Sequence, residues 1–171
     1  MNVKFLNPFV LSAHEIMRLE MRETAERGEL HLETGAYRTD DVTVIISLIG
    51  AVDGVVFYSM SNETAIRFAS ALMRERLDVF DELAQSGIAE LGNVITGQAG
   101  MRLSDAGYES NISTPSLILG RGAMISTLEF PRLVVPLSTS IGVLTIHLSL
   151  KENPHTALKT PQITTPKNFE V

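Results

Sequence analysis

Apolar residues recur every three to four positions in three stretches of the chain, which is the spacing of an amphipathic helix. These stretches predict helices over residues 8–26, 62–76 and 79–104. Each follows residues whose side-chain oxygens can cap a helix: Asn7, then Ser61 with Asn62, then Asp78. Gly28 is the predicted end of the first helix, because glycine tolerates the backbone conformation in which many helices stop.

Shorter apolar and alternating runs lie between glycines and prolines, a pattern typical of strands joined by turns. The predicted strands cover residues 29–34, 41–48, 54–59, 112–119, 124–130, 133–138 and 142–150. Helices and strands that are grouped in this way, with short turns between the strands, predict an α+β fold with antiparallel strands. A short likeness between residues 54–61 and 142–149 also suggests an internal duplication of one helix-and-strands unit.

Periodicity disappears after Leu150, where prolines alternate with threonine, lysine and asparagine. We therefore expect one domain over residues 1–150 and a flexible tail over residues 151–171. The length of 171 residues, with 44% hydrophobic and 20% charged residues, is typical of a globular domain.

Composition and charge argue against several classes of function. The net charge is -6 and the 14 lysines and arginines are scattered, so nucleic acid is not an expected partner. The chain has no cysteine, which excludes disulfides and thiolate chemistry. No apolar run is long enough to cross a membrane and the first residues do not resemble a secretory signal, so we expect a cytoplasmic protein without membrane contact. The four histidines lack the spacing of ligands, so no metal or cofactor bound by this chain is expected.

The third predicted helix has two chemically different faces. One face is apolar and consists of Ala84, Ile88, Leu91, Ile95 and Ala99. On the opposite side, four positions fall within about 60° of one another at 100° per residue: Ser86, Glu90, Asn93 and Gly97. These four residues, the polar stripe, are the candidate functional residues of the chain.

Two further features of this helix lead to predictions about its packing and its end. Gly92, Gly97 and Gly100 each cost about 1 kcal/mol against alanine inside a helix, which suggests that another element packs very close to it. Arg102 falls toward the apolar side, so we expect the helix to end or bend there.

A carboxamide one turn from a carboxylate is suited to assisting phosphoryl transfer to water. The transition state needs an attacking water in line with the leaving oxygen and carries spread negative charge. The neutral amide of Asn93 could orient this water without repelling the phosphoryl oxygens. Glu90 could pair with a cation on a phosphorylated partner, and small Ser86 and Gly97 would let that partner approach. On spacing alone, a merely solvated helix face stays the commoner explanation of such a stripe.

The series Ser86-x3-Glu90-x2-Asn93, followed at a distance by Pro115, resembles the signature of the CheC, CheX and FliY phosphatases of bacterial chemotaxis. The stretch 114–120 also looks like the strand that follows the active helix in this family. The first predicted helix has no Glu-x-x-Asn series, so one site per chain is expected, as in CheX.

The resemblance implies a mainly antiparallel sheet with three long helices packed across it, and a homodimer. It implies an enzyme that hydrolyses the aspartyl phosphate of a CheY-like response regulator in chemotaxis or related two-component signalling. Glu90 would contact the receiver's lysine, Asn93 would orient the hydrolytic water, and the receiver would supply its own Mg²⁺. An alternative is a noncatalytic adaptor of the same fold that binds a receiver or another signalling protein. A small-molecule binding module is a third class, for which the sequence offers no supporting group.

Overall fold

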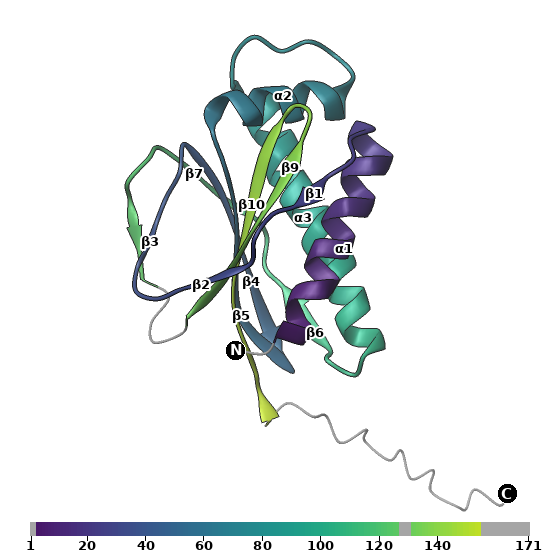
Figure 1. The fold of residues 1–171 in the computed structure, drawn as a ribbon, viewed down its shortest axis with the longest axis vertical. Helices are drawn as coiled ribbons and strands as arrows, with labels where there is room; N and C mark the ends of the chain where they lie inside the picture. Colours follow the sequence, from purple (N-terminus) through teal and green to yellow (C-terminus); the bar gives the residue numbers. More distant parts are fainter. Residues whose placement is uncertain (1–2, 127–130, 155–171) are drawn as a thin grey trace, which may run out of the picture.

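The computed structural model describes residues 3–126 and 131–154, which form α-helices and an antiparallel sheet (Figure 1). The predicted α+β class is confirmed. Helices α1 and α3 lie side by side over one face of the sheet, and α2 crosses its upper end in Figure 1. Among the residues described, no helix has both the length and the apolar character needed to span a membrane.

Helix α1, Leu6–Ile16, starts earlier and stops sooner than predicted. A 3-10 turn at Val3–Phe5 leads into it, so Asn7 lies inside the helix and is not its cap. A π-helical turn, η2, continues it over Met17–Met21. The helix ends at Arg22, whose φ of 59° is left-handed, and not near Gly28.

Capping side chains begin the other two helices. Helix α2, Asn62–Met73, follows Ser61, whose Oγ accepts a hydrogen bond from the Thr64 backbone N–H at 3.1 Å, as predicted. Helix α3, Glu82–Asp105, has Asp81 as its cap, where the carboxylate accepts from the Ala84 N–H at 2.9 Å. The prediction of Asp78 as this cap is wrong.

The sheet consists of strand pairs that are antiparallel throughout the described chain. Its strands are β1 (Glu26–Arg27), β2 (His31–Glu33), β4 (Val42–Gly50), β5 (Val52–Met60), β6 (Ser110–Ile112), β7 (Ser116–Leu119), β9 (Arg132–Thr139) and β10 (Gly142–Glu152). The order is β1-β9-β10-β5-β4-β6, with β2 also on β9 and β7 also on β4. A separate ribbon pairs β3 (Tyr37–Arg38) with β8 (Met124–Ile125).

Two predicted strands differ from the structure. The strand expected over 112–119 is divided by Pro115 into β6 and β7, because proline cannot donate a ladder hydrogen bond. The strand expected over 124–130 begins as β8, but residues 127–130 lie outside the described residues. Residues 151 and 152 of the predicted tail belong to β10, which runs to Glu152. The part of that tail from residue 155 onward also lies outside the described residues.

The main core lies between the helices and the sheet. Alternate residues of the central strands point into it, including Val44, Ile46, Val56 and Tyr58, all at most 1% exposed. The opposite face of the sheet carries a smaller layer that the sequence did not predict. There Tyr37 stacks on Phe57 with ring centroids 4.7 Å apart and also touches the ring of His147.

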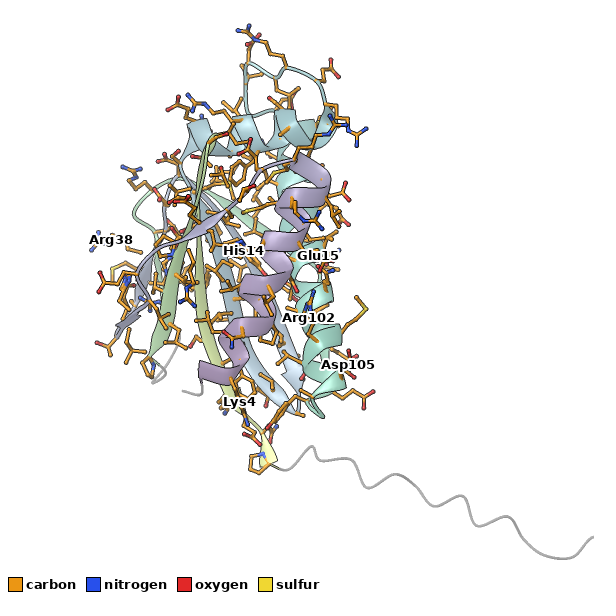
Figure 2. The ribbon with its side chains drawn as sticks, turned by 45° about the vertical axis from the view of Figure 1, so that its right-hand side comes forward. Lys4, His14, Glu15, Arg38, Arg102 and Asp105 are labelled. Atoms are coloured by element: carbon orange, nitrogen blue, oxygen red, sulfur yellow. The ribbon has the colours of Figure 1, made fainter. Side chains whose placement is uncertain are left out.

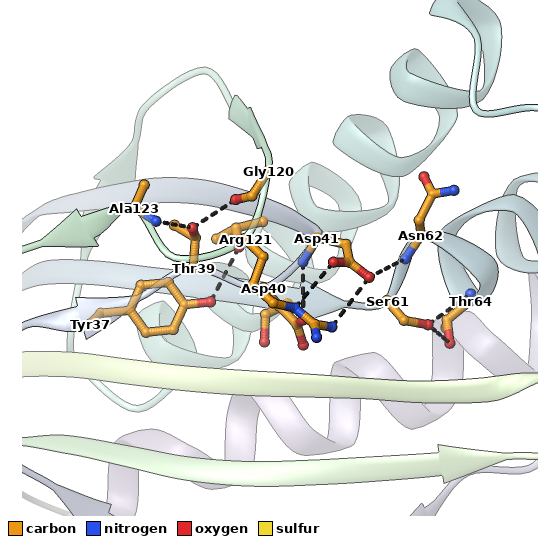
Figure 3. Close-up of polar contacts among 12 residues, drawn as sticks. Tyr37, Thr39, Asp40, Asp41, Ser61, Asn62, Thr64, Gly120, Arg121 and Ala123 are labelled. Atoms are coloured by element: carbon orange, nitrogen blue, oxygen red, sulfur yellow. Dashed lines mark hydrogen bonds and ion pairs between the residues drawn. The ribbon is translucent and has the colours of Figure 1, made fainter.

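A polar network fixes the ribbon against the start of β4 (Figure 3). Arg121 pairs with Asp40 at 2.9 Å and with Asp41 at 3.2 Å. Asp41 in turn accepts a hydrogen bond from the Asn62 backbone N–H at the start of α2. Thr39 donates to the Gly120 carbonyl at 2.8 Å. These contacts hold the tight turn around Arg121, where Gly120 and Gly122 both have positive φ.

Candidate functional site

Helix α3 has the two faces that the sequence predicted. Its apolar face is buried, with at most 3% exposure for Ala84, Ile88, Leu91, Ile95 and Ala99. Gly92 lies on this side, and a Cβ atom there would come within 2.9 Å of the Val44 side chain and 3.2 Å of the Tyr58 ring. Close packing therefore explains Gly92, whereas Gly100 has no neighbour within 4 Å of such an atom.

The polar stripe lies on the outer side of α3. Ser86 and Glu90 are exposed, and Asn93 and Gly97 are half-buried. The Asn93 amide nitrogen donates to the Glu90 carboxylate at 3.3 Å, so the two side chains adjoin. The structure thus brings together the two residues that the sequence singled out for chemistry, with a charged carboxylate and a neutral amide on one ridge.

Buried hydrogen bonds hold the ridge at a fixed height above the sheet. Thr96 bonds to the Gly92 carbonyl one turn earlier and to the Tyr58 hydroxyl, both at 2.8 Å. Burial raises the pKa of Tyr58 far above its ordinary value, and the hydrogen bond with Thr96 offsets this only in part. Tyr58 therefore stays a neutral hydrogen-bonding anchor beneath α3.

Helix α1 fixes the second half of α3 (Figure 2). Arg102 forms an ion pair with Glu15 of α1 at 2.5 Å, and its Nε donates to Ser12. Gln98 donates to the same Glu15 carboxylate at 3.0 Å. The prediction that α3 ends or bends at Arg102 is wrong, because α1 supplies polar partners for it and the helix continues to Asp105.

Three further residues belong to the predicted site: Ser86 and Gly97 lie in α3 with Asn93, and Pro115 lies between two strands that contact α3. Gly97 faces β6, since a Cβ atom there would lie 3.9 Å from the Ile112 side chain. Half-buried Pro115 lies between β6 and β7, both of which contact α3. Ser86 lies one turn before Glu90 on the exposed side. Asn93 is itself half-buried, so part of the residue is accessible from outside the helix.

A cavity of about 240 Å³ lies beside the polar stripe and was not predicted. We call it the interhelical groove, because its lining comes from α1, η2, α2 and α3: Ile16, Glu20, Leu72, Met73, Gly87, Glu90, Leu91 and Val94. Glu90 therefore belongs both to the groove and to the polar stripe. No sequence signal could have found this groove, because its lining comes from three separate helices.

A second cavity, of about 420 Å³, lies on the opposite face of the sheet. It brings together His31 and His147, which looked unrelated in the sequence. Burial lowers the pKa of His147 to about 4, although the nearby Glu33 carboxylate acts in the other direction. Within the described residues, no cluster of three potential metal ligands is present.

Comparison with known proteins places these observations in a family. The family model described as chemotaxis phosphatase CheX matches residues 42–138, a range that includes the whole polar stripe and Pro115. A curated Thermotoga maritima protein named CheY-P phosphatase CheX is 29% identical over 153 residues, which are 88% of this chain and 98% of that protein.

Solved structures agree with this match. A CheC-like superfamily protein from Shewanella sp. PV-4 has a TM-score of 0.79 and 25% identity, and the match covers 88% of this chain and 99% of that one. A chain of the CheX-CheY-BeF3-Mg²⁺ complex from Borrelia burgdorferi has a TM-score of 0.74 and 28% identity, with coverage of 88% and 100%.

Proposed function

Because this chain belongs to the CheX family of chemotaxis phosphatases, we propose that it hydrolyses the aspartyl phosphate of a CheY-like receiver domain. The observation that carries the proposal is the pair formed by Asn93 and Glu90 on the outer ridge of α3, with 3.3 Å between amide and carboxylate. The name of the Thermotoga relative and the complex of the Borrelia relative with CheY support this choice of substrate.

In this mechanism, Asn93 orients the hydrolytic water. The water oxygen forms a bond to phosphorus while the bond between phosphorus and the aspartate oxygen breaks. The products are the free aspartate carboxylate and inorganic phosphate, which keeps one proton of the water on the attacking oxygen and takes the other on a phosphoryl oxygen. The amide suits this position because it is neutral and can both accept from the water and donate to it. An aspartate in its place would repel the phosphoryl oxygens.

Glu90 acts on the partner and not on the reacting water. Its exposed carboxylate can pair with a cation of the receiver, and this pairing sets how far Asn93 enters the receiver's site. The receiver would supply Mg²⁺, which when bound there would neutralise charge on the phosphoryl oxygens. Small Gly97 and Ser86 keep the surface beside Asn93 low enough for a receiver loop to approach.

Replacing Asn93 by alanine tests the proposal. Phosphate release from a phosphorylated CheY-type receiver of the same organism is expected to be about 100- to 1,000-fold slower with Asn93→Ala than with the parent. This range corresponds to a loss of about 3–4 kcal/mol of barrier lowering. Ser104→Ala, a change at an exposed position of the same helix, serves as the matched control and should behave like the parent. Equal rates for Asn93→Ala and the parent would refute the water-orienting role.

A noncatalytic adaptor of the same fold is the second candidate. It would bind the receiver through the same ridge and leave the rate of phosphate loss unchanged. The same assay separates the two functions, because an adaptor shows receiver binding without any acceleration by the parent protein.

A further inference from the structure

We propose that the interhelical groove receives an apolar side chain of the docked receiver domain, beside a lysine or arginine of that domain that pairs with Glu20. This inference rests on the proposed function, because it assigns a second contact of the same partner. It adds an anchoring point that lies outside the polar stripe.

The size and lining of the groove suit a single side chain. Its volume of about 240 Å³ is below the roughly 300–1,000 Å³ of small-molecule sites. Five of its eight lining residues are large and apolar: Ile16, Leu72, Met73, Leu91 and Val94. Val94 remains 38% exposed at this site. Burying such a surface against an apolar side chain would favour binding.

The position of the groove points to the receiver as the source of this side chain. Glu90 lines the groove and also contacts Asn93. Val94 is the next residue along α3 after Asn93. A receiver that places its phosphoryl group at Asn93 must therefore cover part of the groove, and its neighbouring surface can enter it.

The acidic residues of the groove favour a basic side chain on the partner. The two charged residues in its lining, Glu20 and Glu90, are both acidic. In the proposed function, Glu90 already pairs with a cation of the receiver beside the phosphoryl group. Exposed Glu20 forms no ion pair within the described part of the chain, so it can meet a second basic side chain.

The groove also has adaptable walls. The π-helical turn Met17–Met21 carries Glu20, and such turns are frequent at functional sites. The end of the Met73 side chain lies 2.9 Å from the position that a Cβ atom on Gly87 would take. A flexible thioether beside a glycine can move to fit an incoming side chain.

Titration calorimetry with a beryllofluoride-treated CheY-type receiver of the same organism, in Mg²⁺, tests this inference. Met73→Gln and Val94→Gln keep helix-forming side chains but make the wall polar, and each should raise Kd about tenfold. Glu20→Lys should weaken binding similarly, and more strongly at low salt. Leu32→Gln, at an exposed apolar position of β2, and Glu26→Lys, at an exposed acid of β1, are matched controls that should leave Kd unchanged.

Three outcomes separate this inference from the proposed function. In the first, the parent binds the beryllofluoride-treated receiver and hydrolyses the phosphorylated one. If the groove variants then bind as tightly as the parent, the groove inference is wrong and the proposed function stands. If the parent binds without hydrolysis, the proposed function is wrong, and the Kd series still decides the groove. If the parent does not bind the receiver, both are overturned.

Discussion

At the scale of single residues, Glu90 and Asn93 show what helical geometry can predict. Residues three apart on a helix lie on neighbouring positions of one face, so the sequence alone placed the two side chains together. Arg102 shows the limit of the same argument. Its partner Glu15 is 87 residues away in the sequence, and only the packing of α1 on α3 makes that pair.

His147 gives a prediction about pH at this scale. Its pKa is lowered to about 4 by burial, with Glu33 and Asp40 acting against this and Arg132 and His31 adding to it. The pKa of an unfolded histidine is about 6.5. Between these values the unfolded chain binds more protons than the folded one, so the free energy of unfolding rises with pH. Lowering the pH from about 6.5 to 4 should therefore cost about 2–3 kcal/mol of stability at this residue.

Urea unfolding of the parent and of His147→Gln across that pH range checks this expectation. The parent should lose stability more steeply than the variant as the pH falls. Parallel curves would show that His147 does not titrate differently in the folded and unfolded chain.

At the scale of elements, periodicity predicted the faces of the helices better than it predicted their ends. Both Asp78 and Asp81 can cap a helix, and the sequence cannot decide which one does so. The π-helical end of α1 likewise has no sequence signal. Pro115 could have divided the predicted strand 112–119 in advance, because its missing N–H is visible in the sequence.

Gly92 and Gly100 provide a matched pair on α3. Gly92→Ala places a methyl group against Val44 and Tyr58, which costs about 1–3 kcal/mol by overpacking. The better helix propensity of alanine returns about 1 kcal/mol of that cost. Gly100→Ala has the same propensity gain with no neighbour within 4 Å.

Urea unfolding of the two variants should therefore show Gly92→Ala less stable than the parent by up to about 2 kcal/mol and Gly100→Ala as stable or more so. Stabilisation by both substitutions would mean that α3 is not held closely against the sheet. The height of the polar stripe above the sheet would then be less fixed than described.

At the scale of the whole molecule, the sheet order places two hairpins side by side, with β5 next to β10. The residues that open the two similar stretches, Gly54 and Gly142, both have positive φ, near 141° and 150°. The internal duplication remains a prediction, as does the homodimer. The second layer over His147 was beyond sequence reasoning, because it depends on where the ribbon of β3 and β8 folds.

In the proposed function, the amide of Asn93 acts on the reaction while the carboxylate of Glu90 acts on docking. Steady-state hydrolysis of a phosphorylated CheY-type receiver by the parent, Asn93→Ala and Glu90→Ala tests this division most directly. We expect Asn93→Ala to lower kcat with little change in KM, and Glu90→Ala mainly to raise KM. A kcat for Asn93→Ala equal to that of the parent at saturating receiver would contradict this division.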